Sequence, residues 1–163
     1  KDIPKILDLG IDGIIIANIK NEKDILNIFN ISNYPPMGER GLGFSRYNNF
    51  KLNKDDLKIK PILIPMIENI SAYKNLKKIF SYKKLFDGIF VGPVDLSLSI
   101  GDNLNFSKNH KKKISEINKL SKLNKVPMGL HIIKGNKKDV ERVFKNGVNF
   151  IAYLTDTVVL QSY

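Results

Sequence analysis

The feature that most constrains the fold is a regular alternation of short apolar runs with amphipathic stretches. Strands are expected at the apolar runs, over residues 13–17, 62–67, 88–91, 128–131 and 150–153. These runs are almost uniformly apolar, which is typical of parallel strands buried on both faces. Helices are expected over residues 3–9, 21–31, 72–80, 108–123 and 136–144, where apolar residues recur at helical spacing. Strands and helices that alternate with short connections predict a parallel α/β sheet with right-handed crossovers.

The same order fits an open doubly wound sheet or part of a closed (β/α)8 barrel, and two observations favour the barrel. The glycine-rich pattern of dinucleotide-binding sheets follows none of the expected strands. Polar residues follow strand ends instead, at Glu68, Asp95, His131 and Asp156, and barrel active sites lie at those ends. A full TIM barrel takes about 250 residues. We therefore expect residues 1–163 to form a single partial TIM-barrel domain with the C-terminal five strands.

Composition excludes several classes of protein. The chain has no cysteine, so it has neither disulfides nor thiolate metal sites. Its longest apolar runs are too short to span a bilayer and no secretory signal is recognisable, so we expect a cytoplasmic protein without membrane contact. The net charge is +11, but the basic residues are nearly all Lys and spread along the chain. We therefore favour a solvated surface, including Lys111–Lys113 on an exposed helix face, over nucleic-acid binding.

Two carboxylates carry the clearest chemistry. Glu68 ends one apolar strand, and Asp95 follows the next strand after a sharp Gly92-Pro93 turn. Carboxylates on adjacent strands can hold a hard divalent cation such as Mg²⁺ or Mn²⁺ and leave coordination positions free for a substrate. Each residue also has a structural alternative: Glu68 in a salt bridge at the barrel mouth, and Asp95 as the cap of the turn at Leu96-Ser97.

Three ordered motifs resemble one known family. Residues 33–43 (NYPPMGERGLG) resemble the Y-P-P-x-G-x-R-G-x-G segment of the HpcH/HpaI aldolase and citrate lyase family. Residues 66–68 (MIE) resemble its metal-binding strand end, and residues 92–97 (GPVDLS) with Gly101 resemble its G-P-x-D-L-S-x-x-x-G signature. The resemblance extends over the whole chain, because residues 7–10, the strand at Gly129 and residues 150–156 also fall in register.

The resemblance implies a metal-dependent class II pyruvate aldolase of the phosphoenolpyruvate/pyruvate barrel superfamily. Glu68 and Asp95 would hold Mg²⁺, Mn²⁺ or Co²⁺. Gly92, Pro93, Val94 and Asp95 would bind the substrate, with backbone N–H groups at the carboxylate of pyruvate or another 2-keto acid. Cleavage next to the ketone would release an aldehyde and leave an enolate, whose charge a divalent cation stabilises. Family analogy also implies a homo-oligomer.

The resemblance also makes Asp8 and Arg40 candidates for a part in catalysis. Asp8 corresponds to a family Asp that pairs with the acid–base His, and in this role it would act on a neighbouring subunit's site. The equal alternative is that Asp8 makes only a local hydrogen bond at the end of its helix. Arg40 could order its loop, touch substrate or contact a subunit, and we favour the structural role. The family's acid–base His and keto-binding Arg would lie before Lys1. We expect His131 to be a neutral side chain packed at the barrel mouth and His110 to be solvated.

Two other functions stay open at this point. One is a citrate-lyase or malyl-CoA type of lyase that acts on a CoA thioester, although residues 33–43 favour the aldolase branch. The other is a non-catalytic barrel subunit that binds polyanions through its positive charge. Neither the aldehyde, the physiological metal nor the pathway follows from the sequence.

Overall fold

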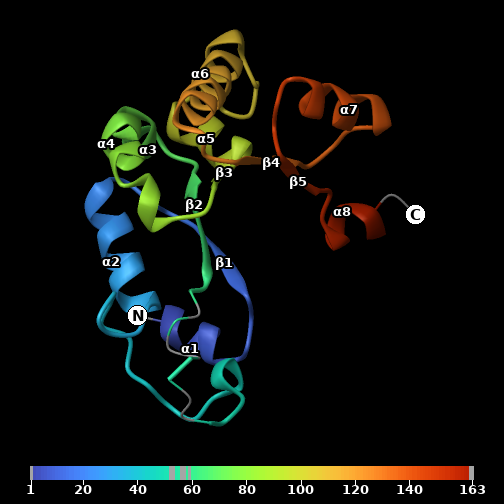
Figure 1. Cartoon of the computed structure of the whole chain (residues 1–163). Helices are drawn as coiled ribbons and strands as arrows, with labels where there is room; N and C mark the ends of the chain where they lie inside the picture. Colours follow the sequence, from blue (N-terminus) through green and yellow to red (C-terminus); the bar gives the residue numbers. More distant parts are fainter. Residues whose placement is uncertain (1, 52–53, 56–57, 59, 162–163) are drawn as a thin grey trace.

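The sheet confirms the partial barrel. The computed structural model describes residues 2–51, 54, 55, 58 and 60–161. Its five strands form one parallel sheet in the order β1-β2-β3-β4-β5, drawn in Figure 1. They span Gly13–Ile16, Ile62–Ile67, Ile89–Val91, Met128–Ile132 and Phe150–Tyr153. Each strand pairs with the next in chain order, so the sheet has none of the order reversal of a doubly wound fold and curves as half of a barrel.

The helices occupy nearly the expected places. They are α1 Ile3–Asp8, α2 Glu22–Ser32, α3 Ile70–Lys74, α4 Leu76–Ser81, α5 Pro93–Ser99, α6 Lys108–Asn124, α7 Lys137–Lys145 and α8 Asp156–Leu160. Short 3-10 turns are η1 Arg46–Asn48 and η3 Lys83–Leu85. The single helix predicted over 72–80 is wrong: Asn75 divides α3 from α4, and its side-chain amide donates to the Lys20 carbonyl oxygen at 3.1 Å.

The hydrophobic core lies between the sheet and the helices that cover it. Ile67, Ile89 and Met128 from three strands are fully buried there, together with Ile79 of α4 and Ile117 of α6. Burial of this apolar surface is the main driving force for the fold.

Strand β1 departs from the expected burial on both faces. Ile14 and Ile16 pack against the core, but Ile15 between them is 46% exposed. Side chains alternate across a strand, so Ile15 points to the opposite, inner face of the sheet. Strand β1 lies at one edge of the sheet, and that edge position leaves its inner face open within the described part of the chain.

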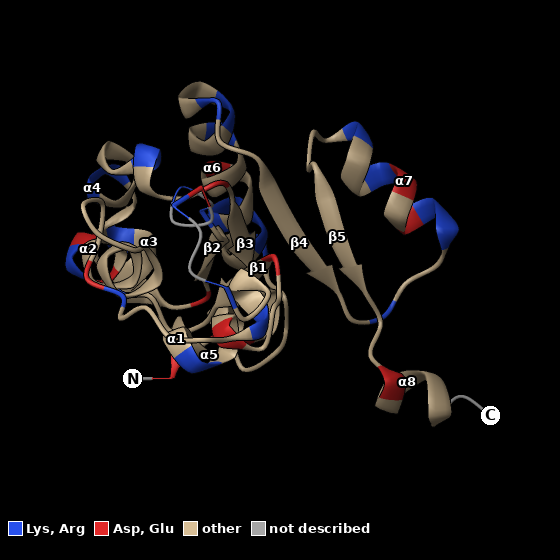
Figure 2. Ribbon diagram, turned by 60° about the horizontal axis from the view of Figure 1, so that its bottom comes forward, with Lys and Arg blue, Asp and Glu red and all other residues tan. Residues whose placement is uncertain are grey.

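Charged side chains are spread over the helices. Figure 2 shows Lys and Arg on α4, α6 and α7 alike. As predicted for the Lys run of α6, Lys111 and Lys112 are exposed. No helix within the described residues is long and apolar enough to cross a membrane.

Candidate metal and substrate site

Glu68 lies at the carboxyl end of β2, against the backbone of the neighbouring strand. The register pairs Ile67 with Val91, so Glu68 comes next to Gly92. A Cβ atom on Gly92 would be 3.0 Å from Glu68 Cβ and 3.2 Å from Glu68 Oε2. A side chain at position 92 would therefore push the carboxylate, and glycine permits the close approach.

A backbone hydrogen bond orients the other oxygen of this carboxylate. Asn18 follows β1 in a left-handed conformation, with φ of 61°. Its backbone N–H donates to Glu68 Oε1 at 2.5 Å. A hydrogen bond to an ionised carboxylate is short and strong, so this contact holds Glu68 in one direction.

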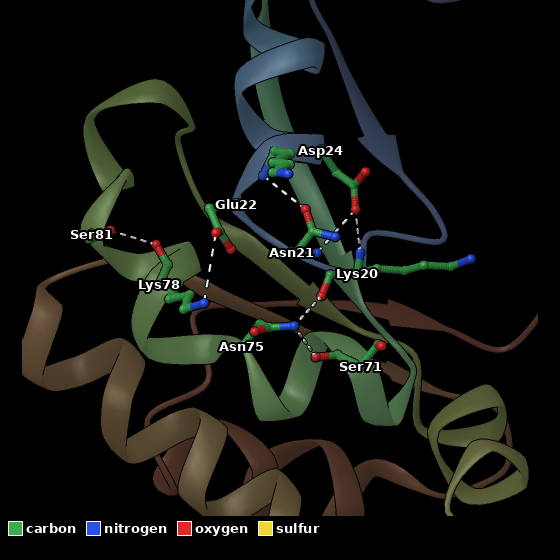
Figure 3. Close-up of polar contacts among 9 residues, drawn as sticks. Lys20, Asn21, Glu22, Asp24, Ser71, Asn75, Lys78 and Ser81 are labelled. Atoms are coloured by element: carbon green, nitrogen blue, oxygen red, sulfur yellow. Dashed lines mark hydrogen bonds and ion pairs between the residues drawn. The ribbon is translucent and has the colours of Figure 1, made fainter.

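The loop after β1 is itself held at several points, shown in Figure 3. The Lys20 backbone N–H donates to Asp24 Oδ2 at 2.7 Å, and the Lys20 carbonyl accepts from the Asn75 amide. The side-chain amide of Asn69 donates to the Ile19 carbonyl oxygen at 2.8 Å. These contacts fix the loop that presents the Asn18 N–H group to Glu68.

Asp95 lies one short turn beyond Gly92. Helix α5 begins with Pro93, and its N-cap residue, Gly92, has no side chain that could cap the first turn. The first N–H groups of a helix have no partner within the helix, so those of Val94 and Asp95 can bind an acceptor. The Asp95 side chain is exposed. Glu68 and Asp95 thus follow two paired strands at the same edge of the sheet, as the sequence predicts.

The donor set of this edge fits a hard cation. Glu68 and Asp95 would supply carboxylate oxygens to such an ion, and Mg²⁺ in proteins is commonly bound by one or two carboxylates together with water or substrate. Within the described ranges, no group of three or more His, Asp or Glu side chains is suited to hold a metal. An ion held by these two carboxylates alone would keep several coordination positions for water or a small molecule. A groove with a volume of about 660 Å³ adjoins Pro93 and Val94, and neither Glu68 nor Asp95 is among its described lining residues.

The segment after α5 is tied back to that helix. Ser97 Oγ donates to Asp102 Oδ2 at 3.1 Å, and the Ser107 N–H donates to the same oxygen at 3.0 Å. The hydrogen bonds from Ser107, and then that from Ser97, hold the pKa of the Asp102 carboxyl below its usual range. Sequence reasoning missed this network, although Ser97 belongs to the GPVDLS motif.

His110 is not solvated, contrary to the prediction. It is 2% exposed, and its Nε2 lies 2.8 Å from the Pro93 carbonyl oxygen. Its ring packs edge-on against Phe106, with centroids 5.3 Å apart. The available signal was helical spacing, because His110 precedes the apolar residues Ile114 and Ile117 by four and seven positions. Because Lys111–Lys113 follow His110 directly, this stretch was predicted to be exposed and the burial of His110 was not predicted.

The two remaining strand-end residues have local partners. His131 of β4 is half-buried, and its Nε2 lies 3.3 Å from the Leu154 carbonyl oxygen, which fits the predicted packing at the barrel mouth. Asp156 is exposed, begins α8 and accepts a hydrogen bond from the Thr157 N–H at 2.7 Å.

Asp8 and Arg40 meet each other rather than Glu68. Asp8 ends α1, before the amino end of β1, and Arg40 Nη2 donates to Asp8 Oδ1 at 2.5 Å. Arg40 is only 2% exposed, and its guanidinium lies over the rings of Tyr34 and Tyr47, at 4.8 and 4.3 Å. The favoured structural role of Arg40 therefore has a physical basis, while a catalytic role for this pair stays a prediction.

Solved structures share this fold. An HpcH/HpaI aldolase from Desulfitobacterium hafniense DCB-2 superposes with a TM-score of 0.87 at 20% identity, over 99% of this chain and 64% of its own. An HpcH/HpaI aldolase/citrate lyase family protein from Burkholderia cenocepacia J2315 gives 0.88 at 20% identity, over 98% and 65%. The citrate synthase SbnG gives 0.82 at 23% identity, over 99% and 64%.

Sequence comparison leads to the same group. A 2-keto-3-deoxy-L-rhamnonate aldolase of Escherichia coli O6:K15:H31 is 26% identical over 165 aligned residues, which cover 96% of this chain and 60% of the relative. The enzyme of that name from strain K12 is 31% identical over 107 residues, 61% of this chain and 39% of its own. The chain thus spans at most about three-fifths of these relatives. The sequence pattern of HpcH/HpaI aldolase/citrate lyase matches residues 1–162, and the chain belongs to that family.

Proposed function

We propose that this chain carries the metal- and keto-acid-binding part of a class II aldolase, a carbon–carbon lyase that releases or consumes pyruvate. The observation that carries the proposal is the setting of Glu68. One of its oxygens accepts the Asn18 N–H, and Gly92 leaves space beside the other. With Asp95 at the next strand end, this carboxylate would hold Mg²⁺, Mn²⁺ or Co²⁺.

The backbone beside Asp95 supports a keto-acid substrate. The N–H groups of Val94 and Asp95 would donate hydrogen bonds to the substrate carboxylate, in agreement with the GPVDLS motif. Cleavage removes the proton of the C4 hydroxyl, breaks the C3–C4 bond and leaves its electron pair in an enolate, which takes a proton at C3 to become pyruvate. A divalent ion between the carboxylates would offset the negative charge on the enolate oxygen.

Exchange of the pyruvate methyl protons tests this proposal without the aldehyde. The full-length protein with Mn²⁺ or Mg²⁺ should exchange these protons in D₂O, followed by NMR, and excess EDTA should stop the exchange. Glu68→Gln and Asp95→Asn should each slow it at least about 100-fold, because both are required to hold the ion. Glu141→Gln, an exposed carboxylate change on α7, should leave it unchanged. Exchange that persists in EDTA would contradict the proposal.

A lyase acting on a CoA thioester is the second candidate, because the family includes citrate lyases. The aldolase name of the curated relatives favours free keto acids. Turnover of acyl-CoA substrates, together with inactivity on free hydroxy-keto acids, would favour the CoA-thioester lyase over the aldolase.

We also propose a homo-oligomer in which Asp8 serves the site of a neighbouring subunit. Its side chain is 38% exposed although Arg40 binds one of its oxygens, so part of the carboxylate is open to a partner. An Asp8→Asn protein that stays oligomeric and fully active would contradict this role.

A further inference from the structure

His110 is buried beside the proposed keto-acid site, and the proposed reaction gives it no part. It lies in the first turn of α6, where its backbone N–H donates to the Ser107 hydroxyl at 3.3 Å. A carbonyl oxygen can only accept, so the 2.8 Å contact with Pro93 requires a proton on His110 Nε2. This side chain therefore donates across from α6 to the first turn of α5.

The Pro93 carbonyl and the Val94 N–H belong to one peptide group. A trans peptide is planar, and its C=O and N–H point in opposite directions. A donor that fixes the Pro93 carbonyl therefore also fixes the direction of the Val94 N–H. Hydrogen bonds in series polarise one another, so the same contact makes the Val94 N–H a stronger donor.

The segment just before His110 has an unusual backbone conformation and contacts the His110 ring. Leu104 and Phe106 have φ of 65° and 47°, a left-handed conformation that bulky residues rarely adopt, and Asn103 before them has φ of 47°. The Leu104 N–H donates to Ser97 Oγ at 3.1 Å, which holds this segment on α5. The strained segment brings the Phe106 ring onto His110. Such strain persists where surrounding contacts impose it, often beside functional sites.

The geometry points to His110 as a positioning residue for the 2-keto acid: through the Pro93 carbonyl, it orients and polarises the Val94 N–H that binds the substrate carboxylate. This inference rests on the proposed function and assigns His110 no contact with substrate. His110 Nδ1 has no hydrogen-bond partner among the described residues. Among the described residues, a substitution of His110 would therefore remove the hydrogen bond of its ring to the Pro93 carbonyl oxygen.

Two amide substitutions separate this role from simple packing. The Gln amide nitrogen reaches about as far as His Nε2, whereas Asn is shorter and ends near the position of Nδ1. His110→Gln should therefore keep the bond to Pro93 and His110→Asn should lose it. His110→Phe retains a ring against Phe106 but has no donor.

The experiment measures pyruvate affinity and Mn²⁺ affinity in the full-length protein, for variants that circular dichroism shows to be folded. His110→Phe and His110→Asn should weaken pyruvate binding about tenfold, within the range for hydrogen bonds to charged groups. His110→Gln should stay within about threefold of the parent, and Mn²⁺ affinity should be the same in all.

Pyruvate affinity unchanged in a folded His110→Phe protein would overturn the inference. A His110→Gln protein as weak as His110→Phe would also overturn it, because ring shape rather than the donor would then matter. A parent protein that binds Mn²⁺ but no pyruvate would instead contradict the proposed function.

Discussion

One added methyl group at Gly92 should damage the metal site while leaving the fold nearly intact. Gly92 has φ of −92°, which alanine adopts without strain. The new Cβ would be 3.0 Å from Glu68 Cβ, 3.2 Å from Glu68 Oε2 and 3.2 Å from the Met66 sulfur. Contacts this short require the neighbours to move by a few tenths of an ångström, and the half-buried Glu68 can move.

The expected size of the effect follows from how strictly a small cation defines its ligand geometry. Mg²⁺ demands nearly ideal coordination with ligands at about 2.0–2.1 Å, so a shift of a few tenths of an ångström is a large error. Changes beside metal ligands typically cost about 10–100-fold in affinity, which is about 1.4–2.8 kcal/mol. We expect Gly92→Ala to lose that much Mg²⁺ or Mn²⁺ affinity but only about 1 kcal/mol of unfolding free energy.

Isothermal titration with Mn²⁺ and urea unfolding measure the two quantities. Gly41→Ala is the matched control, because Gly41 is exposed and a Cβ there would meet nothing within 4 Å. The control should change neither affinity nor stability by more than about 0.5 kcal/mol. A Gly92→Ala protein that binds Mn²⁺ as tightly as the parent would refute the inferred contact between Gly92 and a metal-binding Glu68.

Three further predictions concern stability, each measured by urea unfolding. Arg40→Ala should lower the free energy of unfolding by about 3 kcal/mol, since it removes a buried charge-assisted hydrogen bond and two ring contacts. Arg142 belongs to an exposed ion pair, so Arg142→Ala should lower the same quantity by under about 1 kcal/mol. Equal losses in the two variants would contradict the argument from burial. The hydrogen bond to Glu116 raises the pKa of Tyr73 from 10.0 to about 12. The contribution of this hydrogen bond to the free energy of unfolding is therefore complete below pH 10.0 and lost as pH rises through about 12. Over that interval the stability of Tyr73→Phe should fall less than that of the parent protein. The pKa of Asp102 is lowered, so its ionised carboxylate stabilises the fold above the usual pKa of 3.8, and this stabilisation is lost as pH falls through the lower native pKa. Asp102→Asn should therefore weaken the loss of stability in acid. An unchanged dependence of stability on pH would contradict the hydrogen-bond network around Asp102.

Local patterns were sufficient to predict the sheet. Strands over residues 62–67 and 150–153 lie where the apolar runs predict them, because each run is bounded by residues that end a strand. The short connections predict parallel pairing of successive strands, which the sheet shows. Glu68 and Asp95 could be placed at one edge for the same reason: a strand end defines an edge without knowledge of distant contacts.

Contacts between distant segments were not accessible in this way. Asp8 and Arg40 are 32 positions apart, and their pairing depends on how the loop after α2 returns to α1. Asn75, at which a predicted helix divides, donates to a carbonyl 55 positions away. His110 was judged by its charged neighbours, whereas its burial depends on the packing of α6 against α5. In each case tertiary structure outweighs local preference.

Direct Mn²⁺ binding tests the central claim most directly. Electron paramagnetic resonance of the full-length protein, titrated with Mn²⁺, should show one bound ion per chain that Mg²⁺ displaces. Glu68→Gln and Asp95→Asn should each weaken binding by at least about tenfold, with Glu141→Gln as the exposed control. If both site variants bind Mn²⁺ as tightly as the parent, Glu68 and Asp95 are not the metal ligands and the account of this site is wrong.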